Sequence, residues 1–301
     1  MSLKTGLFAA LQRWLRQLFP AALLMALLSG CSVVGLFNTL IPEGGLEATR
    51  DIAYGQLPRQ KLDVYKPVVP LPAGNGARPV VVFFYGGAWD SGDKASYLFA
   101  AEALTSRGYL VVIPNYRVYP DVVFPTYMED AALAVKWTFD NAARLGGDPD
   151  KIFTMGHSAG AQLAALIAFD GSYLEKVGLD KRRLRGMVSL AGPMDFLPLD
   201  EPKLFLIFPG PVRAASQPIN FISGKEAPVL LLHGLDDKRV GIHNSRNLAA
   251  RIRERGGKVE EDYYPGMGHV GILLAISAPL RSGKPVLDRV SKFIDERAAQ
   301  R

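Results

Sequence analysis

The chain has 301 residues, of which 49% are hydrophobic and 21% charged, which suits one large domain with a sizeable buried core. The net charge is +6, but the first 30 residues hold three of the 35 basic residues and no acid, which leaves 32 basic against 29 acidic residues in the remainder. No basic run with interleaved aromatic residues occurs, so nucleic-acid binding is not expected.

The N-terminal segment has the features of an export signal. Basic residues precede an apolar run at 21–28, which is too short to span a membrane comfortably and ends in small residues. Residues 28–31 (LSGC) resemble the lipobox of bacterial lipoproteins, and Cys31 is the only cysteine. The resemblance implies cleavage before Cys31 and a stable lipid anchor on that residue in the bacterial cell envelope. Because Ser32 follows in place of an aspartate, it also implies the outer membrane, on the periplasmic side.

The expected organisation is a signal peptide at 1–30, the lipidated cysteine and a tether at 31–50, and one domain at 51–301. An uncleaved anchor and an ordinary secretory signal are the alternatives for the first segment. With a single cysteine, an intramolecular disulfide is impossible.

Strand and helix patterns alternate along the domain. Apolar or alternating runs predict edge strands within 52–65 and strands at 79–85, 109–114, 152–155, 187–190, 228–232 and 259–264. Helical spacing and glycine stops predict helices at 96–107, 125–145, 240–255 and 284–300, with a further helix that begins at about 161. This order predicts an α/β fold: an open, mostly parallel, doubly wound sheet with helices on both faces. Residues 196–225 form a long apolar connection, which is either a small lid lining an acyl pocket or an ordinary helix packed on the sheet.

The chemistry centres on the junction between the strand at 152–155 and the small-residue helix that follows. Residues 156–160 (GHSAG) match G-x-S-x-G, the pattern of a sharp turn that exposes a serine nucleophile. The bare pattern also occurs by chance, and the alternative is a glycine-rich turn with a surface serine at Ser158. Two further groups support the catalytic interpretation: the pair Asp236-Asp237 follows the strand at 228–232, and His269 follows the strand at 259–264. The order serine, acid, histidine, each after a strand, is that of the α/β-hydrolases.

From about residue 50 to its end, the chain resembles the carboxylesterase-like branch of the α/β-hydrolase superfamily, which includes hormone-sensitive-lipase-type, feruloyl-esterase-like and kynurenine-formamidase-like enzymes. The resemblance rests on motifs at 85–89, 115–120, 156–160, 233–240 and 268–269.

That resemblance implies roles for individual residues. The family's acid motif, H-G-x-x-D-x-x-V, selects Asp237 over Asp236 as the partner of His269. The family's oxyanion loop implies a hole formed by the backbone N–H groups of three residues, Gly86, Gly87 and Ala159. This chain departs from the loop pattern because Tyr85 stands where the family has a histidine. The tyrosine either substitutes through its hydroxyl or packs in the interior.

The remaining candidate residues receive structural interpretations. His157 is expected to point away from the nucleophile, His233 to be structural, and His243 to lie on the surface. Trp89 is either a wall of the acyl pocket or a core residue. No cluster has the spacing of a metal site and no cofactor is expected.

The expected activity is hydrolysis of a small carboxylic ester through an acyl-enzyme on Ser158, with His269 as base and Asp237 as its orienting acid. Two rivals remain: an amidase or peptidase of the same fold, and a non-catalytic lipid-anchored binding protein of the envelope. The sequence predicts neither the physiological substrate nor the oligomeric state.

Overall fold

The structure is a computed structural model that describes residues 38, 41–70 and 76–300. The expected signal peptide, Cys31 and most of the tether lie outside the described residues. Within the described part of the chain, no helix is both long enough and apolar enough to cross a membrane.

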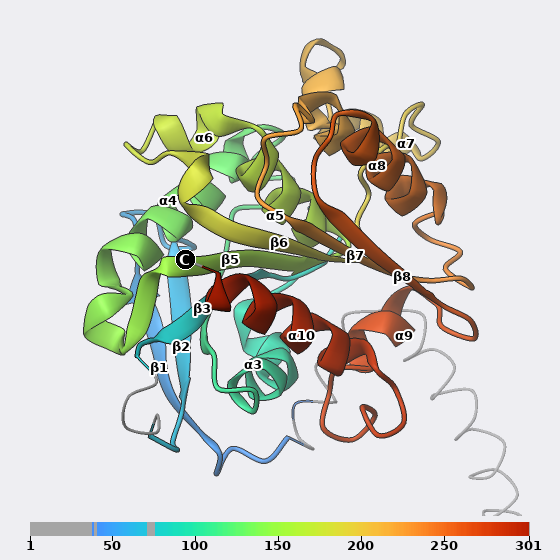
Figure 1. The fold of residues 1–301 in the computed structure, drawn as a ribbon. Coiled ribbons are helices and arrows are strands. Elements are labelled where there is room, and N and C mark those ends of the chain that lie inside the picture. The colour runs from blue at the N-terminus through green and yellow to red at the C-terminus, as the bar shows by residue number, and fades with distance from the viewer. Residues whose placement is uncertain (1–37, 39–40, 71–75, 301) are drawn as a thin grey trace, which may run out of the picture.

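An eight-stranded sheet forms the centre of the domain (Figure 1). Its strand order is β1-β2-β4-β3-β5-β6-β7-β8. Strands β1 and β2 pair antiparallel with each other, β2 pairs antiparallel with β4, and the remaining neighbours are parallel. The strand bounds are β1 Leu46–Ala53, β2 Lys61–Pro67, β3 Arg78–Phe84, β4 Leu110–Pro114, β5 Gly147–His157, β6 Leu184–Leu190, β7 Val229–Gly234 and β8 Val259–Tyr264.

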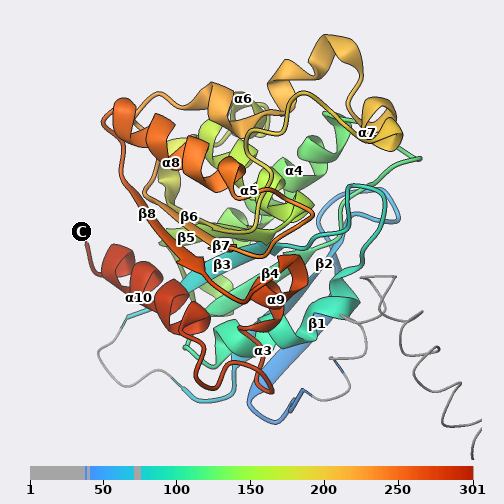
Figure 2. The ribbon, with the colours of Figure 1, turned by 90° about the vertical axis from the view of Figure 1, so that its right-hand side faces the viewer.

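Helices cover both faces of this sheet, as Figures 1 and 2 show. Helices α3 and α10 pack on one face, and α4, α5 and α8 on the other. The helix bounds are α3 Leu98–Thr105, α4 Thr126–Asn141, α5 Ala159–Phe169, α6 Gly171–Glu175, α7 Pro202–Ile207, α8 His243–Glu254, α9 His269–Leu274 and α10 Val286–Ala299. The predicted doubly wound α/β fold is therefore confirmed.

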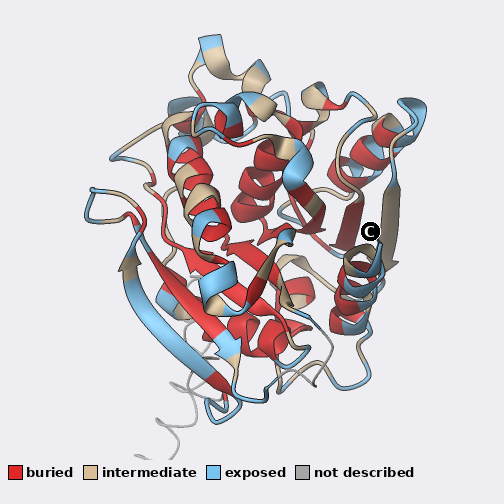
Figure 3. Cartoon of the chain, turned by 60° about the vertical axis from the view of Figure 1, so that its left-hand side comes forward, coloured by how far each residue is buried: buried red, intermediate tan, exposed pale blue. Residues whose placement is uncertain are grey.

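The core follows from the apolar runs in the central strands. Residues 80–84 of β3 and 110–113 of β4 are completely buried, because helices cover these strands on both sides. Burying one such valine or leucine side chain stabilises the fold by about 1.5–3 kcal/mol. Edge strand β1 differs, since most of its residues are exposed (Figure 3). The central strands thus form a rigid base whose carboxyl ends hold the loops discussed below.

Two local differences from the predicted elements have physical causes. Helix α8 begins at His243, not at 240, because the preceding backbone binds the side chain of Asp237: the N–H groups of Arg239 and Val240 both donate to it. Helix α9, which begins at His269, was not predicted, because its six residues are too few to show a helical period.

The long connection between β6 and β7 folds as α7 and three short 3₁₀ turns, Gly210–Val212, Ala214–Ser216 and Pro218–Phe221. Ile207 and Phe208 are completely buried, whereas Phe205 and Leu206 are exposed. This insertion therefore packs on the domain with one face and presents apolar side chains to solvent with the other.

Candidate active site

Ser158 occupies a strained turn between β5 and α5. Its backbone φ of 54° and ψ of −127° lie outside the regions that non-glycine residues favour. Glycine is required on both sides of the turn. A Cβ on Gly156 would lie 2.3 Å from the carbonyl oxygen of Gly160, and a Cβ on Gly160 would lie 2.1 Å from that of Phe84. The two glycines of the G-x-S-x-G pattern therefore allow the end of β5, the start of α5 and the end of β3 to approach one another closely at Ser158.

The structure brings the predicted serine, histidine and acid into one hydrogen-bonded chain. His269 Nε2 lies 2.8 Å from Ser158 Oγ, and His269 Nδ1 lies 2.7 Å from Asp237 Oδ2. These contacts join residues 111 and 32 positions apart in the sequence. In contrast, Asp236 is exposed, and its backbone N–H donates to the carbonyl of Met267.

Asp237 is buried as a carboxylate with several donors around it. Its Oδ1 accepts from the backbone N–H groups of Arg239 at 2.8 Å and Val240 at 2.9 Å. Burial alone would raise the pKa of Asp237, but hydrogen bonds from His233, His269 and the backbone hold the pKa well below its ordinary value. The group next to His269 is therefore an anion throughout the physiological pH range.

The glycine pair after β3 lies beside this chain. Gly87 has a φ of 150°, and a Cβ there would lie 2.2 Å from the carbonyl oxygen of Ser91, so this position requires glycine. Among the described residues, no acceptor takes the backbone N–H of Gly86, Gly87 or Ala159. All three donors are thus free to meet an oxyanion at the end of β3 and the start of α5.

Tyr85, which departs from the family's loop pattern, is completely buried. Its ring stacks on Tyr97 and Tyr116, and its hydroxyl donates to Asn115 Oδ1 at 2.8 Å. The hydroxyl of Tyr116 in turn donates to the Tyr85 carbonyl at 2.7 Å. The side chain therefore packs in the interior, and its hydroxyl is bonded to Asn115.

Two cavities meet at Ser158. The larger, of about 400 Å³, has an apolar wall formed by Trp89, Phe196, Leu197 and Leu204. The smaller, of about 250 Å³, is bordered by Gly86, Gly87, His157 and His269. Ser158 lines both cavities.

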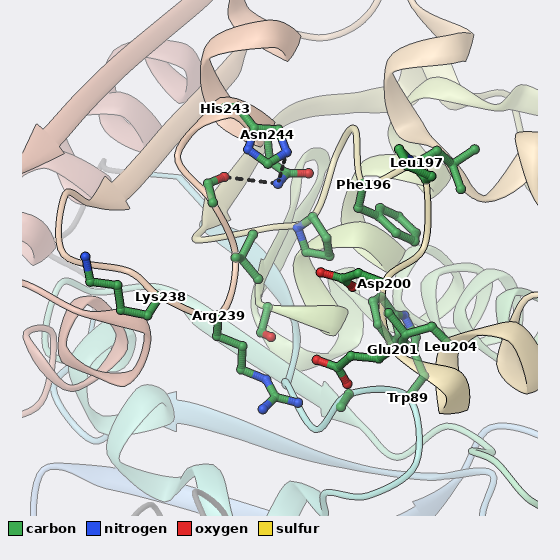
Figure 4. A pocket seen from close by; sticks show the side chains of 16 residues that line it. Trp89, Phe196, Leu197, Asp200, Glu201, Leu204, Lys238, Arg239, His243 and Asn244 are labelled. Carbon is green, nitrogen blue, oxygen red and sulfur yellow. Dashed lines mark hydrogen bonds between the residues drawn. The ribbon is translucent and has the colours of Figure 1, made fainter.

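Charged side chains border the larger cavity. Figure 4 shows the carboxylate of Glu201 and the guanidinium of Arg239 facing each other across it, with Asp200 beside Glu201 and Lys238 pointing away. Their meeting was not predictable, because the four residues come from two connections, β6 to β7 and β7 to α8, whose proximity depends on the fold.

Trp89 is a buried residue that also lines the larger cavity. Its indole Nε1 donates to Gln162 Oε1 at 2.8 Å, and its ring packs against Phe196 and Phe208. With 6% of its surface exposed, it is also part of the cavity wall. His243 lies on the surface as expected, although its side chain also borders the larger cavity.

The sequence predicts that His157 points away from the nucleophile, and in the structure its side chain contacts His269. Its Nε2 lies 2.9 Å from the backbone carbonyl of His269, and the two rings are 4.8 Å apart. The tight turn at Ser158 directs the preceding side chain toward the loop between β8 and α9. Burial and the proximity of His269 lower the pKa of His157 to about 3, so this side chain is a neutral hydrogen-bond donor to that loop.

Among the described residues, no group of three or more histidine, cysteine or acidic side chains is placed to hold a metal ion.

Comparisons with known proteins show which family the chain belongs to. The sequence model of the BD-FAE family matches residues 62–252, a range that includes Ser158 and Asp237. The chain is 29% identical to the isoprenylcysteine alpha-carbonyl methylesterase of Arabidopsis thaliana over 80% of its own length and 60% of that protein. It is 28% identical to esterase LipQ of Mycobacterium tuberculosis over 82% of its own length and 62% of that protein. The chain thus spans about 60% of the length of these curated relatives.

Among solved structures, Thermogutta terrifontis esterase 2 superposes with a TM-score of 0.69 at 25% identity, covering 85% of this chain and 96% of that one. That esterase has also been solved with propionate bound and in a form phosphorylated by paraoxon. Since the family model covers more than half of the sequence, the chain belongs to the BD-FAE family, within the α/β-hydrolase superfamily.

Proposed function

We propose that this protein is a serine hydrolase of carboxylic esters, with Ser158, His269 and Asp237 as its catalytic residues. The observation that carries the proposal is the hydrogen-bonded chain from Ser158 Oγ through both nitrogens of His269 to buried Asp237. Esterase names among the relatives and the paraoxon-modified esterase structure support the same chemistry.

In the first half of the reaction, Ser158 Oγ attacks the acyl carbon while its proton moves to His269 Nε2. The electron pair of the carbonyl bond moves to oxygen, where the N–H groups of Gly86, Gly87 and Ala159 stabilise the negative charge. Collapse of this intermediate breaks the ester C–O bond, and His269 returns the proton to the departing alcohol. Water then repeats the sequence on the acyl-enzyme and releases the acid.

The two cavities suggest where each part of the ester lies. His269 must reach the oxygen of the departing alcohol, and of the two cavities only the smaller one is bordered by His269. The alcohol therefore occupies the smaller cavity, and the acyl group lies against Trp89, Phe196 and Leu204 in the larger one. In this arrangement the insertion between β6 and β7 shapes the acyl site.

Turnover of p-nitrophenyl acetate by the wild-type protein and by Ser158→Ala tests the proposal. We expect kcat to fall on the order of 10⁴–10⁶-fold in the variant, and a fluorophosphonate probe to label Ser158 in the wild type. Full turnover by Ser158→Ala would refute the mechanism. Absence of labelling in the folded protein would favour a non-catalytic binding protein, and faster cleavage of matched anilides than of esters would favour an amidase.

We further propose that the protein is anchored to the bacterial outer membrane through lipid on Cys31. The support is the lipobox-like sequence at 28–31 and the position of the only cysteine. Metabolic labelling with an alkyne fatty acid, followed by membrane fractionation, tests it: label and membrane association should both disappear in Cys31→Ala. Label that persists in the variant would contradict the proposal.

A further inference from the structure

A second histidine touches the acid of the proposed catalytic chain. His233 lies near the end of β7 and is completely buried. Its Nε2 lies 2.9 Å from the backbone carbonyl of Val240 and 3.3 Å from Asp237 Oδ2, and its Nδ1 lies 2.8 Å from Ser245 Oγ. The imidazole therefore connects the loop that carries Asp237 with helix α8.

These partners fix where the protons are. The Val240 carbonyl and the Asp237 carboxylate can only accept hydrogen bonds, so Nε2 of His233 must carry a hydrogen. In the neutral ring Nδ1 is then an acceptor, which the hydroxyl of Ser245 satisfies by donating to it. One N–H of His233 is thus shared between the backbone of the loop and the carboxylate.

The consequence concerns one oxygen of Asp237. Oδ1 is held by two backbone N–H groups, whereas Oδ2 faces both His269 at 2.7 Å and His233 at 3.3 Å. A donor on Oδ2 withdraws negative charge from the oxygen that stabilises the imidazolium of His269. The hydrogen bond from His233 is also the largest of the influences that lower the pKa of Asp237.

We propose that His233 is a positioning residue for the reaction: its Nε2–H orients Asp237 and limits the negative charge that Asp237 presents to His269. This inference rests on the proposed function. It assigns a role to a residue whose sequence context suggested only a structural one.

Other charged or titratable groups near His269 are few. His157 contacts it from the turn after β5. Arg239, from the loop after β7, and Asp90, from the loop after β3, border the same cavity. Asp90 is paired with Lys203. In the part of the chain that the structure describes, Asp237 is the group that contacts both His233 and His269.

A matched pair of variants, His233→Asn and His233→Gln, tests the role. The amide of glutamine reaches the place of Nε2 and can donate to Asp237, whereas the shorter amide of asparagine reaches only the place of Nδ1, near Ser245. Ser245→Ala is the control, because it removes a buried hydrogen bond of the same imidazole and leaves the donor to Asp237 intact.

The readout is kcat/KM for p-nitrophenyl acetate from pH 4.5 to 9, whose acidic limb reports protonation of the general base. In His233→Asn the carboxylate keeps more charge on Oδ2 and stabilises the imidazolium more, so the acidic limb should move to higher pH by about 0.5 unit, a threefold change in proton affinity. His233→Gln should keep the limb within ~0.2 unit of wild type. Ser245→Ala should lower Tm without moving the limb.

An unmoved limb in folded His233→Asn would overturn the inference, as would an equal movement in Ser245→Ala. Proton NMR supplies a readout that does not depend on turnover: the downfield resonance of the His269 Nδ1–H should move in His233→Asn and remain in place in His233→Gln. Failure of the proposed function is recognised separately, because Ser158→Ala would then retain activity whatever the His233 variants show.

Discussion

Replacing Asp237 with asparagine should remove most of the activity through the tautomer of His269. In the wild type, Oδ1 of Asp237 accepts from the N–H groups of Arg239 and Val240, at 2.8 and 2.9 Å. The single oxygen of asparagine is needed there, so its NH₂ group must face Nδ1 of His269, 2.7 Å from the position of Oδ2. His269 then accepts at Nδ1 and carries its hydrogen on Nε2, where it cannot take the proton of Ser158.

The expected loss of kcat is about 10⁴-fold at neutral pH, the magnitude that a wrong tautomer causes in serine hydrolases with such a triad. This corresponds to ~5.4 kcal/mol of transition-state stabilisation. Asp236→Asn is the matched control, because Asp236 is the neighbouring carboxylate and is exposed. Its kcat should stay within about twofold of wild type, since an exposed carboxylate of this kind contributes little.

The assay is steady-state hydrolysis of p-nitrophenyl acetate at pH 7.5, with Tm measured on each variant to show that it is folded. Two results would refute the reasoning. One is Asp237→Asn with more than about a tenth of wild-type kcat. The other is a greater loss in Asp236→Asn than in Asp237→Asn, which would transfer the role of the acid to the neighbouring residue.

Three further predictions concern stability, the oxyanion loop and the acyl site. The pKa of His157 is about 3 in the folded protein against an ordinary value of 6.5. As pH drops from 6.5 toward 3, the unfolded chain therefore binds the extra proton first, and the free energy of unfolding falls by up to ~1.4 kcal/mol per pH unit. Urea titrations at pH 6.5 and 5 should show a smaller fall of this free energy in His157→Phe than in the wild type. An equal fall in the two proteins would contradict the prediction. Tyr85→Phe removes the hydroxyl that bonds to Asn115 and Arg59 and should lower the free energy of unfolding by about 1 kcal/mol. It should lower kcat less than about threefold, because Asn115 and Arg59 keep other partners. A hundredfold loss of kcat would show that the hydroxyl takes part in the reaction. Leu204→Trp should reduce turnover of p-nitrophenyl butyrate about tenfold more than that of the acetate, and equal losses would place the acyl group in the other cavity.

The fold was predictable because its strongest signals are local. The apolar run that became β3 is uninterrupted over residues 79–85, and a strand buried on both faces has no need of polar positions. Glycines that stop helices are equally local: Gly146, with a φ of 86°, closes the turn after α4. Such signals give the element order and, through the usual handedness of crossovers, the parallel centre of the sheet.

The position of the reactive groups was predictable for a related reason. In a parallel sheet, the loops after the strands meet at one edge, so Ser158, Asp237 and His269 converge once their strands are assigned. The distances that join them still had to come from the structure.

The contacts of the buried histidines were not predictable. The expectation that His157 points away from the nucleophile did not include its bond to the His269 carbonyl, which joins positions 112 residues apart. His233 bonds to Ser245 and Val240, which come from the next helix and loop. No periodic pattern or motif spacing in the sequence indicates either set of contacts, because each depends on how a loop folds back over the sheet. The partner of a buried histidine in such a loop therefore becomes apparent only from the folded structure.

Tyr85 departs from the family's loop motif, yet the backbone N–H groups that follow it can keep their positions. The proposed oxyanion donors are backbone N–H groups, and the position of Gly86 and Gly87 depends on where the preceding residue is held. Here a tyrosine, completely buried, stacked on two aromatic rings and bonded to Asn115, anchors that residue from the interior. The glycines themselves have no such freedom, since a Cβ on Gly87 would collide with a carbonyl oxygen. Substitution is thus tolerated where a side chain only supports the loop, and is excluded where the backbone itself must approach.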